Sequence, residues 1–248
     1  MNESIGRGSE RKPSGTLAET CPVFQPRNLL KFREIKRPII LPLLRPGRPP
    51  AKEVAQRLFE AAKKGITARG WERFTGLKIR KLRVSGCEPT LGKEHLLQLL
   101  ERIEGSGYQF YLETNGILLG ADRDYVRKLS GFSKFIYVRV SFKAATPEGF
   151  TLRTGALGEY YDLPFKALKH LLDEGIYARA AAMTDPKVMP REERRILPRR
   201  LEEIDPSAEY SKTLEKERVD AYDTTIKRLK ASADLEFAKQ LEKILTSQ

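Results

Sequence analysis

Apolar side chains recur every three or four residues in several stretches of the chain, which is the spacing of one face of an α-helix. Residues 51–64 show this pattern, because Val54, Leu58 and Ala62 would share one face and Gly65 follows them. Residues 93–103 repeat leucines in the same way. The spacing predicts further helices over residues 122–129, 163–174, 191–201, 221–230 and 234–245.

Shorter runs between these helices are typical of strands, and the clearest is FIYVRVSF at residues 135–142. The other predicted strands are residues 79–85, 109–113 and 176–183, with an edge strand within 215–221. Because helices and strands alternate, we expect an α/β fold with a parallel sheet and crossover helices. Parallel sheets bind ligands at the carboxyl ends of their strands, so the residues after each strand are candidates for a site.

The two ends of the chain differ from its middle in composition. Residues 21–50 contain seven prolines, which leave little room for a helix, and residues after 206 are highly charged. We therefore expect a basic, irregular, Pro- and Arg-rich segment over residues 1–50 and a βα core over residues 51–206. A charged helical region over residues 207–248 would pack on this core.

Composition excludes several classes of protein. No apolar run approaches the roughly 18 residues of a membrane span, and the opening residues MNESIGRGSE lack the apolar region of a signal peptide. We therefore expect a cytoplasmic protein with no membrane partner. The chain has two cysteines, Cys21 and Cys87, which excludes a disulfide-rich fold and a metal site built from three or four of its own thiolates.

The positive charge is concentrated near the start of the chain. Residues 1–80 contain 18 Lys and Arg against 7 Asp and Glu, whereas the whole chain has a net charge of +13. These cations could contact the phosphates of a nucleic acid, with Phe24 and Phe32 stacking on bases, although their spacing favours a solvated basic tail because it matches no nucleic-acid-binding motif. The basic side chains concerned are Arg27, Lys31, Arg33, Lys36, Arg37, Arg45, Arg48 and Lys52.

The motif SGCEPTLG at residues 85–92 lies between a predicted strand and a predicted helix. Gly86 permits a tight turn or a close approach by a ligand, and Glu88 offers a carboxylate to a cationic group. Pro89 stiffens the start of the next helix, whose free N–H groups face the same edge. An ordinary strand-to-helix turn would also use these residue types.

Two more motifs end the next predicted strands. ETNG at residues 113–116 places Thr114 and Asn115 in an Asn-Gly turn, where their side chains could meet a ligand. In VRVSFK at residues 138–143, alternation places the apolar residues on one side of the strand and Arg139, Ser141 and Lys143 on the other. Polar side chains directed into a barrel-like sheet suggest a ligand with carboxylate or hydroxyl groups.

Taken together, these three motifs at successive strand ends resemble the radical S-adenosylmethionine (radical SAM) superfamily, in particular archaeal-type enzymes with SGGEPTLG. The likeness runs from about residue 48 to at least residue 183 and is expected to extend to residues 205–206. It implies a partial TIM-like (βα)6 barrel, S-adenosylmethionine and a 4Fe-4S cluster as cofactors, an electron donor as partner and a substrate of unknown class. It also implies that the cofactor-binding residues are Gly86, Cys87, Glu88, Pro89, Thr114, Asn115, Ser141 and Lys143, with Glu88 facing the amino group of the methionine moiety.

The sequence departs from the family pattern in two places. Cys87 stands where the family has a second glycine, so a side chain projects toward the cofactor. The CxxxCxxC motif that holds the cluster is absent, and Cys21 and Cys87 are weak candidates for iron ligands, since the cluster needs three thiolates. The first strand of the barrel is therefore expected to be incomplete or altered.

Residues 1–50 stand where the first strand and cluster loop belong, and three explanations stay open. The upstream reading frame could be shifted, the protein could be a relative that has lost redox chemistry, or the basic arm could be a genuine addition. The matching functions are S-adenosylmethionine-dependent radical chemistry, non-catalytic binding of an adenosyl ligand (or a scaffold role), and nucleic-acid binding by the arm.

Overall fold

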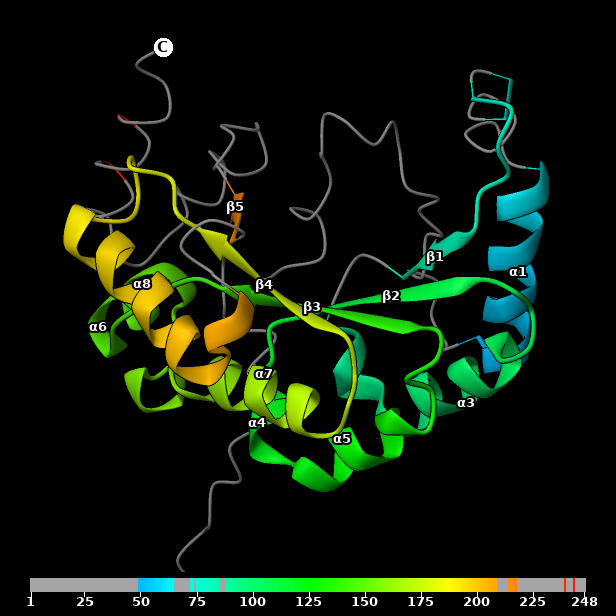
Figure 1. Ribbon diagram of the computed structural model, residues 1–248, viewed down its shortest axis with the longest axis horizontal. Helices are drawn as coiled ribbons and strands as arrows, with labels where there is room; N and C mark the ends of the chain where they lie inside the picture. The colour runs from blue at the N-terminus through cyan, green and yellow to red at the C-terminus, as the bar shows by residue number, and fades with distance from the viewer. Residues whose placement is uncertain are drawn as a thin grey trace, which may run out of the picture.

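The computed structural model describes residues 49–64, 72–73, 75–84, 88–208, 214–217, 239 and 243 (Figure 1). In chain order the elements are α1 (Ala51–Lys64), β1 (Lys81–Arg83), the 3-10 helix η1 (Pro89–Gly92), α3 (Lys93–Ile103), β2 (Gln109–Thr114), α4 (Ile117–Ala121), α5 (Arg123–Ser130), β3 (Ile136–Phe142), α6 (Pro147–Thr154), η2 (Gly158–Tyr160), α7 (Leu163–Asp173), β4 (Ala178–Met183), α8 (Arg191–Ile204), η3 (Pro206–Ala208) and β5 (Glu215–Glu217).

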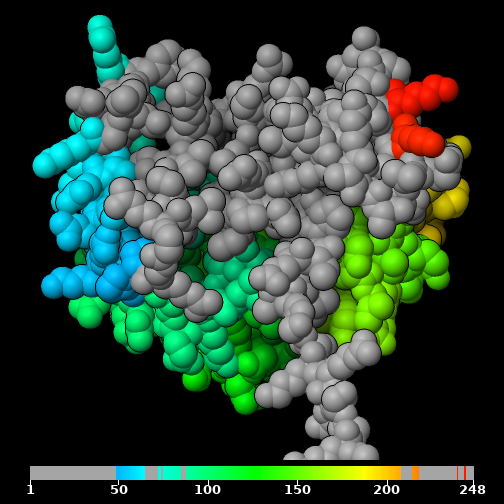
Figure 2. Space-filling view, turned by 180° about the vertical axis from the view of Figure 1, so that it is seen from behind, coloured from blue at the N-terminus to red at the C-terminus, as the bar shows by residue number. Residues whose placement is uncertain are grey.

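The five strands form one parallel sheet in which they lie side by side in chain order. The crossovers therefore all run in one direction, and helices α3 to α8 lie on one side of the curled sheet (Figure 1). Figure 2 shows the molecule from behind, with α1 in blue at one edge and later elements toward the opposite edge. The predicted α/β class and a partial, barrel-like sheet are confirmed.

The two faces of the sheet differ because side chains alternate along each strand. On β3, Val138, Val140 and Phe142 are at most 1% exposed and belong to the core beneath the helices. Arg139 and Ser141, at the intervening positions, project from the face opposite the described helices, as the alternation predicts. The helices complete the core with Leu96, Leu100, Leu119, Leu129, Leu168, Leu171, Leu197 and Leu201.

Two glycines let α4 approach its neighbours closely. Gly116 precedes α4 with a φ of 77°, in the left-handed region, and an added Cβ there would lie 2.9 Å from Val140 Cγ1. At Gly120 an added Cβ would lie 2.0 Å from the carbonyl oxygen of Leu163, the first residue of α7. The expected Asn-Gly turn is confirmed, and α4 packs against the backbone of α7.

A buried ion pair joins the segments that follow β3 and β4. Arg153 of α6 is 3% exposed and pairs with Glu193 of α8, which is 8% exposed. Arg153 also donates to the carbonyl oxygens of Lys143 and Val188 at 2.6 and 3.2 Å. Glu193 accepts a hydrogen bond from the backbone N–H of Ala145 at 3.0 Å. The pair therefore fixes the backbone that continues from β3 at the carboxyl edge.

Most predicted elements are present with small changes in length. The helices predicted over residues 51–64 and 93–103 have the bounds of α1 and α3, whereas β1 is shorter than predicted. The edge strand expected within 215–221 is β5. Sequence reasoning missed α4, because five residues are too few to show a helical period, and α6, because its apolar positions do not gather on one face.

Several predictions fall outside the described residues. These include the helix over 221–230, the helix over 234–245 apart from residues 239 and 243, and almost all of the segment over 1–50, so the division into three parts stays a prediction. Among the described helices, none has both the length and the apolar character needed to cross a membrane.

Candidate functional site

Glu88 collects hydrogen bonds at the carboxyl edge of the sheet, just before η1. Its Oε1 accepts from the Thr90 hydroxyl at 2.7 Å, the Thr90 backbone N–H at 3.2 Å and the Thr114 hydroxyl at 2.7 Å. Its Oε2 accepts from the backbone N–H of Asn115 at 2.7 Å. One carboxylate thus joins the start of η1 to the end of β2.

The surroundings of Glu88 supply hydrogen-bond donors but no counter-charge from the described residues, none of which forms an ion pair with it. Burial raises the pKa of Glu88 above its usual value, and the hydrogen bonds from Asn115, Thr90 and Thr114 offset only part of this effect. Because a carboxylate oxygen has two lone pairs, Oε2 can accept a second donor. A half-buried, closely hydrogen-bonded carboxylate of this kind is stabilised by a cationic ligand group.

The turn after β2 holds Glu88 in place. The Thr114 hydroxyl donates to Glu88 and accepts from the Gly116 N–H at 3.1 Å, and Thr114 is only 3% exposed. The Asn115 side chain accepts from the N–H of Ile117 at 2.9 Å, at the first turn of α4. Thr114 and Asn115 therefore position Glu88 through a hydroxyl and a backbone N–H.

Ser141 and Lys143 extend the same edge from the neighbouring strand, since Thr114 of β2 is in register with Val140 of β3. Within the part of the chain that the structure describes, no hydrogen bond engages the Ser141 hydroxyl, which faces away from the helices. The Nζ of Lys143 is 3.2 Å from Oε2 of Glu217 in β5. The sequence predicted both residues for the site but gave Lys143 no partner.

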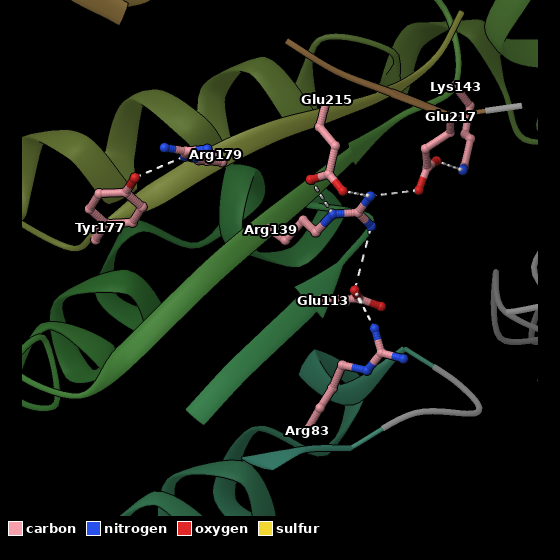
Figure 3. Close-up of polar contacts among 8 residues, drawn as sticks. All are labelled: Arg83, Glu113, Arg139, Lys143, Tyr177, Arg179, Glu215 and Glu217. Atoms are coloured by element: carbon pink, nitrogen blue, oxygen red, sulfur yellow. Dashed lines mark hydrogen bonds and ion pairs between the residues drawn. The ribbon is translucent and has the colours of Figure 1, made fainter. Parts of the chain in front are cut away.

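An ion network crosses the sheet face opposite the described helices from β1 to β5, with Arg139 between three glutamates (Figure 3). Nε and Nη2 of Arg139 each lie 2.8 Å from an oxygen of Glu215, and Nη2 also lies 2.9 Å from Glu217. Nη1 is 3.5 Å from Glu113, which accepts from Arg83 at 2.7 Å. Desolvation opposes the charge of Arg139, but the glutamates hold its pKa above the usual range.

Three tyrosines form a row beside this network. The rings of Tyr111 and Tyr137 are 4.7 Å apart between centroids, and those of Tyr137 and Tyr177 are 4.3 Å apart. Lys81 lies over Tyr111 at 4.9 Å, and Arg179 donates to the Tyr177 hydroxyl at 2.8 Å (Figure 3). Hydrogen bonds, first from Tyr137 and then from Arg179, lower the pKa of Tyr177. The rings contact one another and the flanking cations, so the row stabilises the sheet face.

The structure brings together part of the predicted cofactor site. Glu88, Thr114 and Asn115 are in direct contact, Pro89 begins η1, and Ser141 and Lys143 follow on the next strand. Gly86, Cys87 and Cys21 lie outside the described residues, as do the basic residues of the predicted arm other than Lys52. Among the described residues there is no group of three or more His, Cys, Asp and Glu able to hold a metal ion.

Sequence reasoning missed the role of Glu215 and Glu217. The strand was predicted, but the partners of its glutamates were not. The signal was present in the alternation of β5, which places both carboxylates on one face, as the alternation of β3 does for Arg139 and Lys143. Predicting which side chains pair across a sheet requires knowledge of the register of its strands. Here the paired residues are more than 70 positions apart in the sequence, so no local pattern gives that register.

Comparison with known proteins adds no family assignment, because no family model and no curated protein matches the chain.

Proposed function

We propose that this protein binds S-adenosylmethionine, or a closely related adenosyl amino acid, at the carboxyl edge of its half barrel. The observation that carries the proposal is Glu88, a carboxylate held by four hydrogen bonds and left without a counter-charge by the described residues. It occupies the position that the radical SAM-like motif assigns to the group that receives the ligand ammonium.

The energetics of Glu88 favour a cationic ligand. Enclosing an ionised carboxylate without a counter-charge is unfavourable, and the raised pKa of Glu88 reflects this. An α-ammonium group at Oε2 would supply both the missing charge and a further hydrogen bond. Thr114 and Asn115 hold the carboxylate in one orientation before the ligand arrives, so less ordering is needed on binding.

The rest of the edge offers groups for the remainder of such a ligand. Ser141 has a hydroxyl for a ribose or carboxylate oxygen, and Lys143 has an ammonium for a carboxylate. In this proposal the five described strands correspond to the second to sixth strands of a (βα)6 barrel. The first strand would then belong to the chain that precedes α1.

The 4Fe-4S cluster implied by the resemblance does not fit the residues of this chain. A cluster of this type needs three thiolates from one loop, and the whole sequence contains only Cys21 and Cys87. We therefore derive no radical step. The proposed activity is binding of the adenosyl ligand, with Glu88 holding its ammonium.

Calorimetric titration of S-adenosylmethionine into iron-free protein tests the proposal. Saturable binding of one ligand per chain is expected. Glu88→Gln should weaken it by at least about tenfold, because a charge-assisted hydrogen bond is lost. The matched control is Glu101→Gln on the exposed side of α3, which should leave affinity unchanged. Equal affinity of the Glu88→Gln variant and the unmodified protein would overturn the assignment.

A further inference from the structure

Lys143, the only cation that the described residues of the proposed site offer to a ligand carboxylate, is already paired inside the protein. Its Nζ lies 3.2 Å from Oε2 of Glu217, and the side chains are 17% and 19% exposed. The other oxygen of Glu217 lies 2.9 Å from Nη2 of Arg139. Glu217 therefore bridges two cations with its two oxygens, as Figure 3 shows.

The partner of Lys143 comes from a distant part of the sequence. Glu217 is the last residue of β5, and its register partner is Met183 at the end of β4. Its carboxylate thus reaches the same edge as Ser141 and Lys143. β5 is only three residues long, and Arg139 binds both oxygens of Glu215 at 2.8 Å, which helps to hold the strand there.

A ligand carboxylate and the Glu217 carboxylate would compete for the same ammonium. Two carboxylates at one Lys143 repel each other, because a single positive charge neutralises only one of them. Glu217 has a second cation available in Arg139, so it can leave Lys143 without becoming an unpaired charge. Exchange of one carboxylate for the other is therefore feasible within the structure.

We propose that Glu217 is an internal competitor for Lys143, so that a ligand carboxylate binds there only by displacing it. The inference rests on the proposed binding of an adenosyl amino acid at this edge. It assigns a partner to each charged group on the ligand's α-carbon: the ammonium goes to Glu88, and the carboxylate exchanges with Glu217 at Lys143. The pairing of Glu217 with Lys143 lowers the affinity for every ligand that carries this carboxylate. It does not change the affinity for a ligand that lacks the carboxylate.

The test compares S-adenosylmethionine with its decarboxylated form, which keeps the ammonium, the sulfonium and the adenosine. Calorimetry on full-length, iron-free protein should show that Glu217→Gln raises the affinity for S-adenosylmethionine by about tenfold. Affinity for the decarboxylated form should change less than about twofold. The matched control is Glu215→Gln on the same strand, which contacts Arg139 but not Lys143. It should change neither affinity by more than about twofold.

Equal effects of Glu217→Gln on the two ligands, or no effect on either, would overturn the inference. If neither ligand binds the unmodified protein or any variant, the proposed function itself fails. Arg139 keeps Glu113 and Glu215 in the Glu217→Gln variant, so the variant is expected to fold. Lys143→Met gives a second test: without the ammonium, Glu217 repels the ligand carboxylate, so the affinity for S-adenosylmethionine should fall while that for the decarboxylated form changes less than about twofold. Unchanged affinity for S-adenosylmethionine would contradict the role of Lys143.

Discussion

The substitution Glu193→Gln probes the buried ion pair that fixes the backbone after β3. Glutamine has the shape of glutamate and can still accept the hydrogen bond from the Ala145 N–H. It carries no charge, so Arg153, at 3% exposure, would keep the glutamine oxygen and the carbonyl oxygens of Lys143 and Val188 as acceptors but would lose its counter-ion. The substitution therefore leaves a buried guanidinium without its counter-ion.

The expected loss follows from the burial of the pair. Removing one partner of a buried ion pair costs about 3–5 kcal/mol, and because Arg153 keeps two carbonyl acceptors we expect about 3 kcal/mol. The pair lies directly against the α6 backbone at Gly149, where an added Cβ would lie 2.6 Å from both Glu193 carboxylate oxygens. An exposed ion pair contributes about 0–1 kcal/mol.

Urea unfolding measured by circular dichroism gives the free energy of unfolding for each variant. Glu192→Gln is the matched control, because Glu192 is the preceding residue of α8 and pairs with Arg195 at 3.6 Å with both side chains more than half exposed. It should lose less than about 0.5 kcal/mol. Losses of similar size for Glu193→Gln and Glu192→Gln would refute the assigned role of the buried pair.

Further outcomes follow from the same contacts. Gly120→Ala should lower the free energy of unfolding in urea by at least about 3 kcal/mol, since its Cβ would lie 2.0 Å from the Leu163 carbonyl oxygen. The control Gly131→Ala, whose Cβ would have its nearest atom at 3.5 Å, should lower it by less than about 1 kcal/mol. Similar losses in the two variants would contradict the close packing of α4 on α7. Burial alone would raise the pKa of Glu217, but Lys143 and Arg139 hold this pKa below the usual value. The ionised Glu217 therefore contributes fully to the stability of the folded protein above the ordinary glutamate pKa, and this contribution is lost as the pH falls through the lowered pKa. Glu217→Gln should therefore reduce the loss of stability below about pH 4, and an unchanged acid profile would argue against that pairing. Anaerobic reconstitution should yield far fewer than about four irons per chain, and a full complement would show that ligands from elsewhere complete a cluster.

The sequence predicted the elements whose pattern is local. The leucine repeat of α3 and the alternation of β3 depend only on burial against one face, so the predicted α3 bounds are right and those of β3 nearly so. The end of β2 was also readable, because Asn115 and Gly116 favour a tight turn whatever surrounds them. Both cases require no knowledge of the register between strands.

The parts that sequence reasoning missed depend on contacts between distant segments. The bond from the Thr114 hydroxyl to Glu88 joins residues 26 positions apart, and the pairing of Lys143 with Glu217 joins residues 74 positions apart. Arg153 belongs to α6, whose sequence resembles a loop, and its burial is determined by Glu193 in α8. Charge pairing of this kind follows from the curl of the sheet and cannot be seen in a local window.

In the proposed function, Glu88 is a half-buried carboxylate whose counter-charge comes from a cationic ligand. The most direct measurement is the pH titration of its side-chain carboxyl by ¹³C NMR, with the resonance assigned by its loss in Glu88→Gln. Without ligand the pKa should lie above the ordinary glutamate value, because burial favours the protonated form. S-adenosylmethionine should lower this pKa, because its ammonium stabilises the ionised carboxylate. An ordinary glutamate pKa that the ligand does not change would contradict the account.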